Sequence, residues 1–141
     1  MMIFEEPGNV PYATMNELIR LRVDKSKLAM RDAENNYNMG SYNLTINRLY
    51  YAMFYMISAL LLKFQLYGKT HKGILILFSE HFVKTGFFTK SETEVYEKLF
   101  TMRMEGDYDD FVLFSKEQVE PWFEKVRAFM QVIERKLESE N

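Results

Sequence analysis

The segment Arg103-Met104-Glu105-Gly106-Asp107-Tyr108 has residue types suited to binding a phosphate group or an oxyanion. An arginine guanidinium donates charge-assisted hydrogen bonds to phosphate, and in a partly dry site it stabilises developing negative charge. Asp107 and Tyr108 could orient this arginine or take part in proton transfer. The structural alternative is an ion pair between Arg103 and Asp107 that only secures a helix end.

A second candidate anion site is the turn Lys69-Thr70-His71-Lys72, which precedes a predicted helix. Free backbone amides and the helix dipole favour an anion at a helix start, and Lys69 and Lys72 add positive charge. Thr70 can cap the helix, and His71 could titrate near neutral pH. The alternative is an exposed turn with a capping threonine and no ligand.

A third group of polar residues lies on the most apolar stretch of the chain, Leu49–Leu62, which contains no charge, glycine or proline. The stretch is too short to span a membrane, so it predicts a central, buried helix of a bundle. Arg48, Tyr51, Tyr55 and Ser58 share one face of this helix. They form either a satisfied core network or the lining of a pocket shared with Arg103, and in the second case Arg48 and Tyr51 should point toward Arg103.

The elements that must position these residues are all predicted to be helical. The sequence predicts an all-α, antiparallel up-and-down bundle in one domain, 14–141, after an irregular arm, 1–13. Capping-box patterns at Thr14–Glu17, Ser91–Glu94 and Ser115–Gln118 mark helix starts, and Gly106 marks an end. Pro121 is expected to bend the last helix. The predicted helices are 14–38, 42–66, 71–84, 91–105 and 116–138.

Apolar residues that recur at helical spacing predict the buried faces of these helices. On the first helix they are Leu18, Leu21, Leu28, Ala29, Ala33 and Tyr37. On the last helix they are Val119, Trp122, Val126, Phe129, Ile133 and Leu137, a seam without a gap. His81 is expected to pack beside Phe78 and Phe82 rather than to carry chemistry.

Composition excludes several classes of chemistry. The 141 residues include no cysteine, so disulfides and zinc–thiolate sites are excluded. The net charge of −2 argues against a sequence-independent nucleic-acid coat, although a local basic pocket remains compatible with it. The two histidines lack metal-ligand spacing and no glycine-rich phosphate loop occurs, so we expect no metal and no cofactor. Met1–Pro11 has no signal-peptide pattern, so we expect a cytoplasmic protein without membrane contact.

The candidate segments together resemble the signature blocks of the HEPN domain family (higher eukaryotes and prokaryotes nucleotide-binding). The blocks are Asn47–Phe54, Gly68–Gly73 with Phe82–Gly86, and Arg103–Tyr108, in that order. The resemblance runs from about Leu18 to Glu138. It implies an all-α bundle that is often a homodimer, and kinship to the helical substrate-binding domains of nucleotidyltransferases. Many members resemble the toxin of a prokaryotic pair whose other member is a minimal nucleotidyltransferase.

Several HEPN members are metal-independent ribonucleases, whose motif is an arginine followed four to six residues later by a histidine. At the matching position this chain has Tyr108, and no histidine follows His81. Tyrosine, with an ordinary pKa of about 10, is a poorer general base near neutral pH than histidine.

Three hypotheses follow. The first is a module that binds a nucleotide or RNA phosphate beside a nucleotidyltransferase partner, using Arg103 and Asp107 with help from the other candidate groups, namely Arg48, Tyr51, Lys69 and Lys72. The second is a metal-independent endoribonuclease, in which Arg103 stabilises charge and His71 or Tyr108 moves the proton. The third is a non-catalytic interaction protein whose arginines form structural ion pairs.

Overall fold

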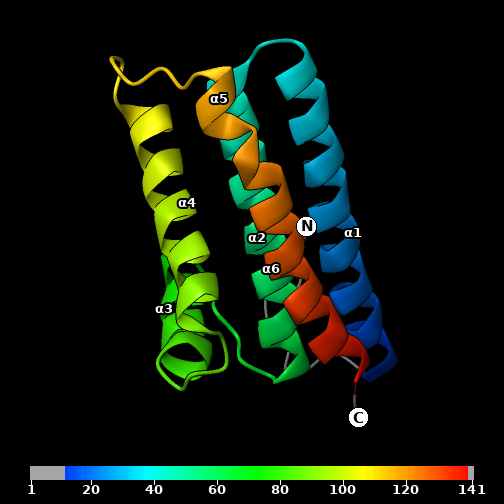
Figure 1. Ribbon diagram of the computed structural model, residues 1–141. Coiled ribbons are helices and arrows are strands. Elements are labelled where there is room, and N and C mark those ends of the chain that lie inside the picture. The colour runs from blue at the N-terminus through cyan, green and yellow to red at the C-terminus, as the bar shows by residue number, and fades with distance from the viewer. Residues whose placement is uncertain (1–11, 140–141) are drawn as a thin grey trace.

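The computed structural model describes residues 12–139, and all regular structure within this range is helical (Figure 1). This confirms the predicted all-α helical bundle. The elements in chain order are α1 (Tyr12–Asn38), α2 (Tyr42–Lys63), α3 (His71–Phe78), a π-helical turn (Ser79–Val83), α4 (Lys90–Tyr108), α5 (Lys116–Val119) and α6 (Pro121–Glu138).

Helix α2 is the centre of the bundle, as its apolar sequence predicts. It packs against α1, α3, α4, α5 and α6. From Ala52 to Leu62, every side chain except Tyr55 is buried. A helix surrounded in this way has little contact with solvent, so its buried polar residues must find partners among the neighbouring helices. Within residues 12–139, no helix combines the length and hydropathy that crossing a membrane requires.

Aromatic rings join the later helices to the core. Phe129 of α6 stacks on Phe88, with ring centroids 4.9 Å apart and planes 8° apart. Phe78 of α3 contacts both rings, at centroid distances of 5.4 Å and 6.3 Å. This cluster fixes α6, the start of α4 and the end of α3 relative to one another.

Two predicted helix starts were wrong. Thr14 lies inside α1, which begins at Tyr12, so Thr14–Glu17 is not a capping box; most of the predicted arm, 1–13, falls outside the described residues. Helix α4 begins at Lys90, and the residues of its capping box are Thr89 and Glu92 rather than Ser91 and Glu94. Thr89 with Glu92 and Ser91 with Glu94 both fit the capping-box pattern. With the helix starting at Lys90, the buried side chain of Phe88 comes immediately before the cap.

Gly106 does not end the fourth helix, which continues to Tyr108. A Cβ atom at Gly106 would lie 2.8 Å from Cε2 of Phe114, closer than real side chains approach. Glycine is therefore needed there for the close approach of Phe114, and this role has no signature in local sequence.

The third and fifth predicted helices are each interrupted. The α-helical part of the third stops at Phe78 and is followed by the π-helical turn, whose wider spacing changes the direction of later side chains. As a result His81 is exposed, and the expectation that it packs beside Phe78 was wrong.

Pro121 begins α6 instead of bending one helix, because proline has no N–H to donate to the preceding turn. The backbone of Glu120 stays helical between α5 and α6 (φ −52°, ψ −45°).

Candidate functional site

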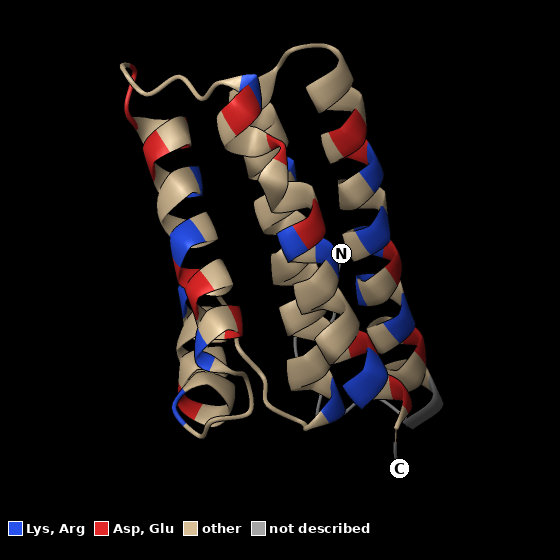
Figure 2. Ribbon diagram, in the orientation of Figure 1, with Lys and Arg blue, Asp and Glu red and all other residues tan. Residues whose placement is uncertain are grey.

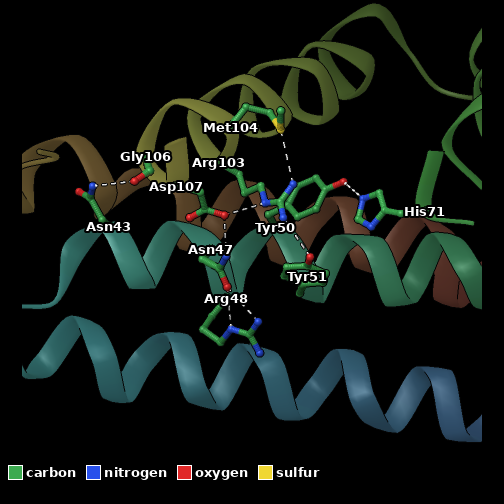
Figure 3. A network of polar contacts seen from close by, with 10 residues as sticks. All are labelled: Asn43, Asn47, Arg48, Tyr50, Tyr51, His71, Arg103, Met104, Gly106 and Asp107. Atoms are coloured by element: carbon green, nitrogen blue, oxygen red, sulfur yellow. Dashed lines mark hydrogen bonds and ion pairs between the residues drawn. The ribbon is translucent and has the colours of Figure 1, made fainter. Parts of the chain in front are cut away.

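Arg103 on α4 points toward α2 and is held by two side chains (Figure 3). Its Nη2 donates to the hydroxyl of Tyr51 at 3.0 Å, and its Nε lies 2.9 Å from Oδ2 of Asp107. The side chain of Arg103 is 12% exposed and that of Asp107 is 24% exposed. The ion pair that sequence spacing suggested is therefore present, partly shielded from water.

The polar contacts continue from Asp107 across α2 toward α1. Asn47 Nδ2 donates to Oδ2 of Asp107 at 3.0 Å, and Arg48 donates to Oδ1 of Asn47 from Nε and Nη2, at 3.1 Å and 2.9 Å. We call the five residues Asn47, Arg48, Tyr51, Arg103 and Asp107 the arginine cluster. Tyr51 faces Arg103 as expected, whereas Arg48 reaches it only through Asn47 and Asp107.

The arginine cluster carries net positive charge. It contains two guanidinium groups and one carboxylate, and that carboxylate contacts Arg103. In the described part of the chain, no carboxylate lies within 4.0 Å of Arg48; its guanidinium instead lies 5.1 Å from the ring centroid of Tyr51. An anion arriving here would meet a cation that no acidic side chain neutralises.

Aromatic rings surround the guanidinium of Arg103. It lies 5.1 Å from the ring centroid of Tyr50, 5.3 Å from that of Tyr51 and 5.8 Å from that of Tyr108. Such contacts orient a guanidinium without neutralising its charge. Tyr108 is 70% exposed, so the solvent side of the arginine is bordered by an accessible ring.

His71 belongs to the same neighbourhood but is separated from Arg103 by Tyr50. Its Nε2 lies 2.6 Å from the Tyr50 hydroxyl, and its ring stacks on Phe54 with centroids 4.1 Å apart. Burial, and then the charge of Arg103, lower the pKa of His71. Burial raises the pKa of Tyr50 despite the opposing effect of Arg103. At neutral pH both side chains are therefore uncharged, and the tautomer of His71 decides which of them donates this hydrogen bond.

We expect the folded protein to lose stability as the pH falls below about 6.5, the ordinary pKa of histidine. Folding lowers the pKa of His71, so the unfolded chain binds that proton more readily, and protonation favours unfolding. The contribution of His71 is complete above its unfolded pKa and is lost as the pH falls through its folded pKa. NMR titration of the imidazole ring protons gives a midpoint for each of the two histidines in the chain. If both midpoints lie at or above about 6.5, the lowered pKa of His71 is contradicted.

Among the described residues, no hydrogen bond or ion pair joins the lysines of the second candidate site to the arginine cluster. Thr70 caps α3 by accepting the N–H of Gly73 at 2.9 Å, as predicted. The side chains of Lys69 and Lys72 are exposed, and Lys72 lines a small groove of about 390 Å³ on the outer face of α3 and α4. The helix start thus contributes His71 to the cluster's surroundings, while both lysines remain on the surface.

Two asparagines that sequence reasoning did not single out hold this region together. Asn47 bridges Asp107 and Arg48, as described above. Asn43 Nδ2 donates to the carbonyl of Val112 at 2.8 Å and of Gly106 at 3.3 Å, and its Oδ1 accepts the N–H of Phe114 at 2.8 Å. Apart from Arg48, these partners lie 60 or more residues away in sequence, so no spacing rule indicates them.

The chain matches the model of the HEPN domain over residues 19–136. It belongs to the HEPN family. A Thermotoga maritima protein named "UPF0332 protein" is 42% identical over 93 residues, which cover 66% of this chain and 70% of that protein. A Methanocaldococcus jannaschii protein named "Putative toxin" is 31% identical over 119 residues, covering 84% of this chain and 81% of that protein. A second M. jannaschii protein of that name is 33% identical over 67 residues, covering 48% of this chain and 50% of that protein.

In this HEPN chain, the motif position that the ribonuclease pattern gives to histidine is Tyr108. The ring of Tyr50 lies between His71 and Arg103, since it contacts both the imidazole and the guanidinium. Within residues 12–139, no group of three or more histidine, aspartate or glutamate side chains is placed to hold a metal ion.

A wide groove elsewhere on this HEPN domain is a poor alternative for an anion. It has a volume of about 1020 Å³ and lies between the end of α1 and the α5–α6 junction. Its lining includes Glu34, Glu117, Glu120 and Glu124, whereas its arginine, Arg127, is paired with Glu34 at 2.6 Å. Four carboxylates would repel a phosphate group, so groove size does not identify the anion site here.

Proposed function

We propose that this HEPN protein binds a phosphate group of RNA or of a nucleotide at the arginine cluster. The observation that carries the proposal is the excess of guanidinium groups over carboxylates in the cluster. Asp107 pairs with Arg103, and no described carboxylate lies within 4.0 Å of Arg48. Phosphate is the biological anion best suited to guanidinium groups, since each can donate more than one hydrogen bond to it.

The geometry supports a binding role for Arg103 without displacement of Asp107. Nε of Arg103 is held by Asp107 and Nη2 by Tyr51, whereas the acceptor nearest to Nη1 is the thioether sulfur of Met104, at 3.5 Å. A thioether is a weak acceptor, so a phosphate oxygen would readily replace it. Asp107 and Tyr51 then act as positioning residues that hold the guanidinium in one orientation.

The arrangement favours binding over ribonuclease catalysis. Transfer of the 2′-hydroxyl proton needs a base within hydrogen-bonding reach of the reacting atoms. The Nε2 of His71 is engaged by Tyr50, and the imidazole is stacked on Phe54. A catalytic role for His71 therefore requires Tyr50 to release it, whereas phosphate binding at Arg103 displaces only the thioether of Met104.

The partners are part of the same proposal. The toxin names of two relatives support a toxin–antitoxin-type pair, in which we propose that the other protein is a minimal nucleotidyltransferase. We propose a homodimer as well, as the family resemblance implies. Two exposed side chains at and after the end of α4, Tyr108 and Leu113, supply contact surface for such assemblies.

Binding of a labelled single-stranded RNA, followed by fluorescence anisotropy at fixed salt and with EDTA present, tests the proposal. We expect Arg103→Ala to weaken binding about 10- to 100-fold, since it removes charge-assisted hydrogen bonds to phosphate. Arg103→Lys should restore part of the affinity, because lysine keeps the charge without the planar donor array. Arg127→Ala is the matched control, since Arg127 is paired with Glu34 in the acidic groove and should not affect binding.

Equal affinity of wild type and Arg103→Ala, or no binding by either, would contradict the proposal. If Arg103→Ala fails to fold by circular dichroism, Arg48→Ala replaces it, because Arg48 has no ion pair to lose. Gel analysis of the same samples separates the alternatives. Arg103-dependent RNA cleavage in EDTA would establish the ribonuclease, and a lowered melting temperature without any ligand effect would establish the structural ion pair.

A further inference from the structure

The acidic groove between the end of α1 and the α5–α6 junction shares no residue with the arginine cluster. Figure 2 shows acidic residues along α5 and the first turns of α6, which form one wall of this groove. The backbone stays helical through Glu120, so the wall from Glu117 to Gln131 follows one continuous helical path of about 21 Å. An extended peptide of about six residues has the same length.

Three of the four carboxylates that line this groove have no cation beside them. Glu34 is neutralised by Arg127, at a distance of 2.6 Å. Among residues 12–139, no lysine or arginine nitrogen lies within 4.0 Å of Glu117, Glu120 or Glu124. Glu120 and Glu124 are four residues apart along a helical path, so their charges repel each other. A cation bound between them would relieve that repulsion.

Arg127 shows how this groove holds a guanidinium group. In addition to its ion pair with Glu34, its guanidinium lies 5.6 Å from the ring centroid of Phe123. A carboxylate and an aromatic face together are surroundings that suit an arginine. Tyr37 and Glu120 also line the groove and provide a second ring and a second carboxylate, for which the described residues offer no arginine.

The hydroxyl of Tyr37 gives an independent indication of a missing partner. Its oxygen atom is buried and has no hydrogen-bond partner among the described residues. Burial, and then the neighbouring carboxylate of Glu120, raise the pKa of Tyr37, so the hydroxyl stays protonated at neutral pH. A buried polar group without a partner is unfavourable, and native proteins contain few of them. A hydrogen-bond donor that enters beside Glu120 would satisfy this oxygen.

We propose that the acidic groove is the docking site for an arginine-rich segment of a partner protein. One guanidinium group can donate to the Glu120 carboxylate and to the Tyr37 hydroxyl at the same time, because its donors are fixed in a planar array. An ammonium group is a point charge that does not stack on a ring in this way. The surface is separate from the arginine cluster, so this inference goes beyond the proposed function and does not depend on it.

The shape of the groove favours a peptide over a small polyamine. Its volume is about 1020 Å³, and its lining includes the apolar surfaces of Pro121, Phe123 and Ala128 between the charged groups. A polyamine would neutralise the carboxylates and leave these apolar surfaces in contact with water. A peptide has a backbone and aliphatic side-chain stems to cover them.

Binding of a labelled hexa-arginine peptide, followed by fluorescence anisotropy at about 0.15 M salt, tests the proposal. We expect Glu120→Gln/Glu124→Gln to weaken binding about tenfold, because it removes two of the carboxylates that no cation neutralises. The matched control is Glu94→Gln/Glu97→Gln, which makes the same change in net charge on exposed positions of α4. Salt screens these distant charges, so the control should bind within about twofold of wild type.

Tyr37→Phe tests the contribution of the buried hydroxyl. This change keeps the ring and removes an oxygen that makes no hydrogen bond in the free protein. We therefore expect an unchanged or higher melting temperature together with binding about threefold weaker. In NMR spectra of wild type, hexa-arginine should shift the amide signals of Ala128 and Gln131, which line the groove.

Four outcomes would overturn the proposal. They are no binding of hexa-arginine by wild type, equal weakening by the two double variants, a Tyr37→Phe variant that binds as tightly as wild type, and amide shifts confined to other helices. Spermine that binds as tightly as hexa-arginine would overturn the assignment to a peptide. Circular dichroism of each variant verifies that the exposed substitutions leave the fold intact.

Discussion

Replacing Phe129 with alanine will lower the free energy of unfolding by about 3–5 kcal/mol, the range for truncating a buried aromatic side chain. Phe129 is 1% exposed, and its ring stacks on Phe88 and contacts Phe78. Truncation removes these contacts and leaves a cavity where α6, α3 and the start of α4 meet. Rigid neighbouring rings cannot easily close that cavity, so the loss should fall toward the upper part of the range.

Urea denaturation of wild type and variant, followed by circular dichroism, measures this loss. The chain offers a control of identical chemistry in Phe111, which is 95% exposed. Phe111→Ala should change the unfolding free energy by no more than about 0.5 kcal/mol, because the site makes no core contacts. Similar losses for the two variants would show that Phe129 is not part of the packed core.

The second large effect is expected for Asn43→Ala, which should destabilise the protein by roughly 2–4 kcal/mol. Asn43 makes three hydrogen bonds, to Gly106, Val112 and Phe114. Alanine leaves these partly buried backbone groups without their partner, at about 1–3 kcal/mol for each group that water does not reach. It also frees the segment after α4, so the Phe114 amide should exchange with solvent much faster.

Hydrogen exchange at Phe114 and urea denaturation together test the role of Asn43. Asn35→Ala is the matched control, because Asn35 is an exposed asparagine on α1 and its replacement should change stability by no more than about 0.5 kcal/mol. Unchanged exchange at Phe114 in Asn43→Ala would mean that the turn is held by its own packing. In that case Asn43 would not fix the position of the segment after α4.

Sequence periodicity predicted the core well where a helix is enclosed and poorly where it lies at the edge of the bundle. The seam of the last helix is buried from Val119 to Ile133, and α2 is the central helix. On α1, however, Leu21 and Leu28 are 47% and 49% exposed. Figure 1 shows α1 at one side of the bundle, so it buries a narrow strip and leaves apolar residues beside that strip in water. Apolar character alone does not tell these two positions apart.

The candidate site was predictable to the extent that it depends on one helix at a time. The spacing of Arg103 and Asp107 on α4 indicated their ion pair, and the polar face of α2 indicated that Tyr51 would need a partner. The bridging role of Asn47 depends on how α4 lies against α2, which only the packed structure defines. The position of His71 behind Tyr50 has the same origin.

The enclosure of α2 also affects the order in which the protein can fold during synthesis. The chain is made from its N-terminus, so α2 is complete at Lys63 while α6 is complete only at Glu138. At about 5–20 residues per second, roughly 4–15 seconds separate these events. During that interval α3 and α4 are completed and can join α1 in covering parts of α2, but the side that α6 covers stays open. The nascent chain therefore exposes that apolar side of α2 to the ribosome exit and to chaperones until the final helix arrives.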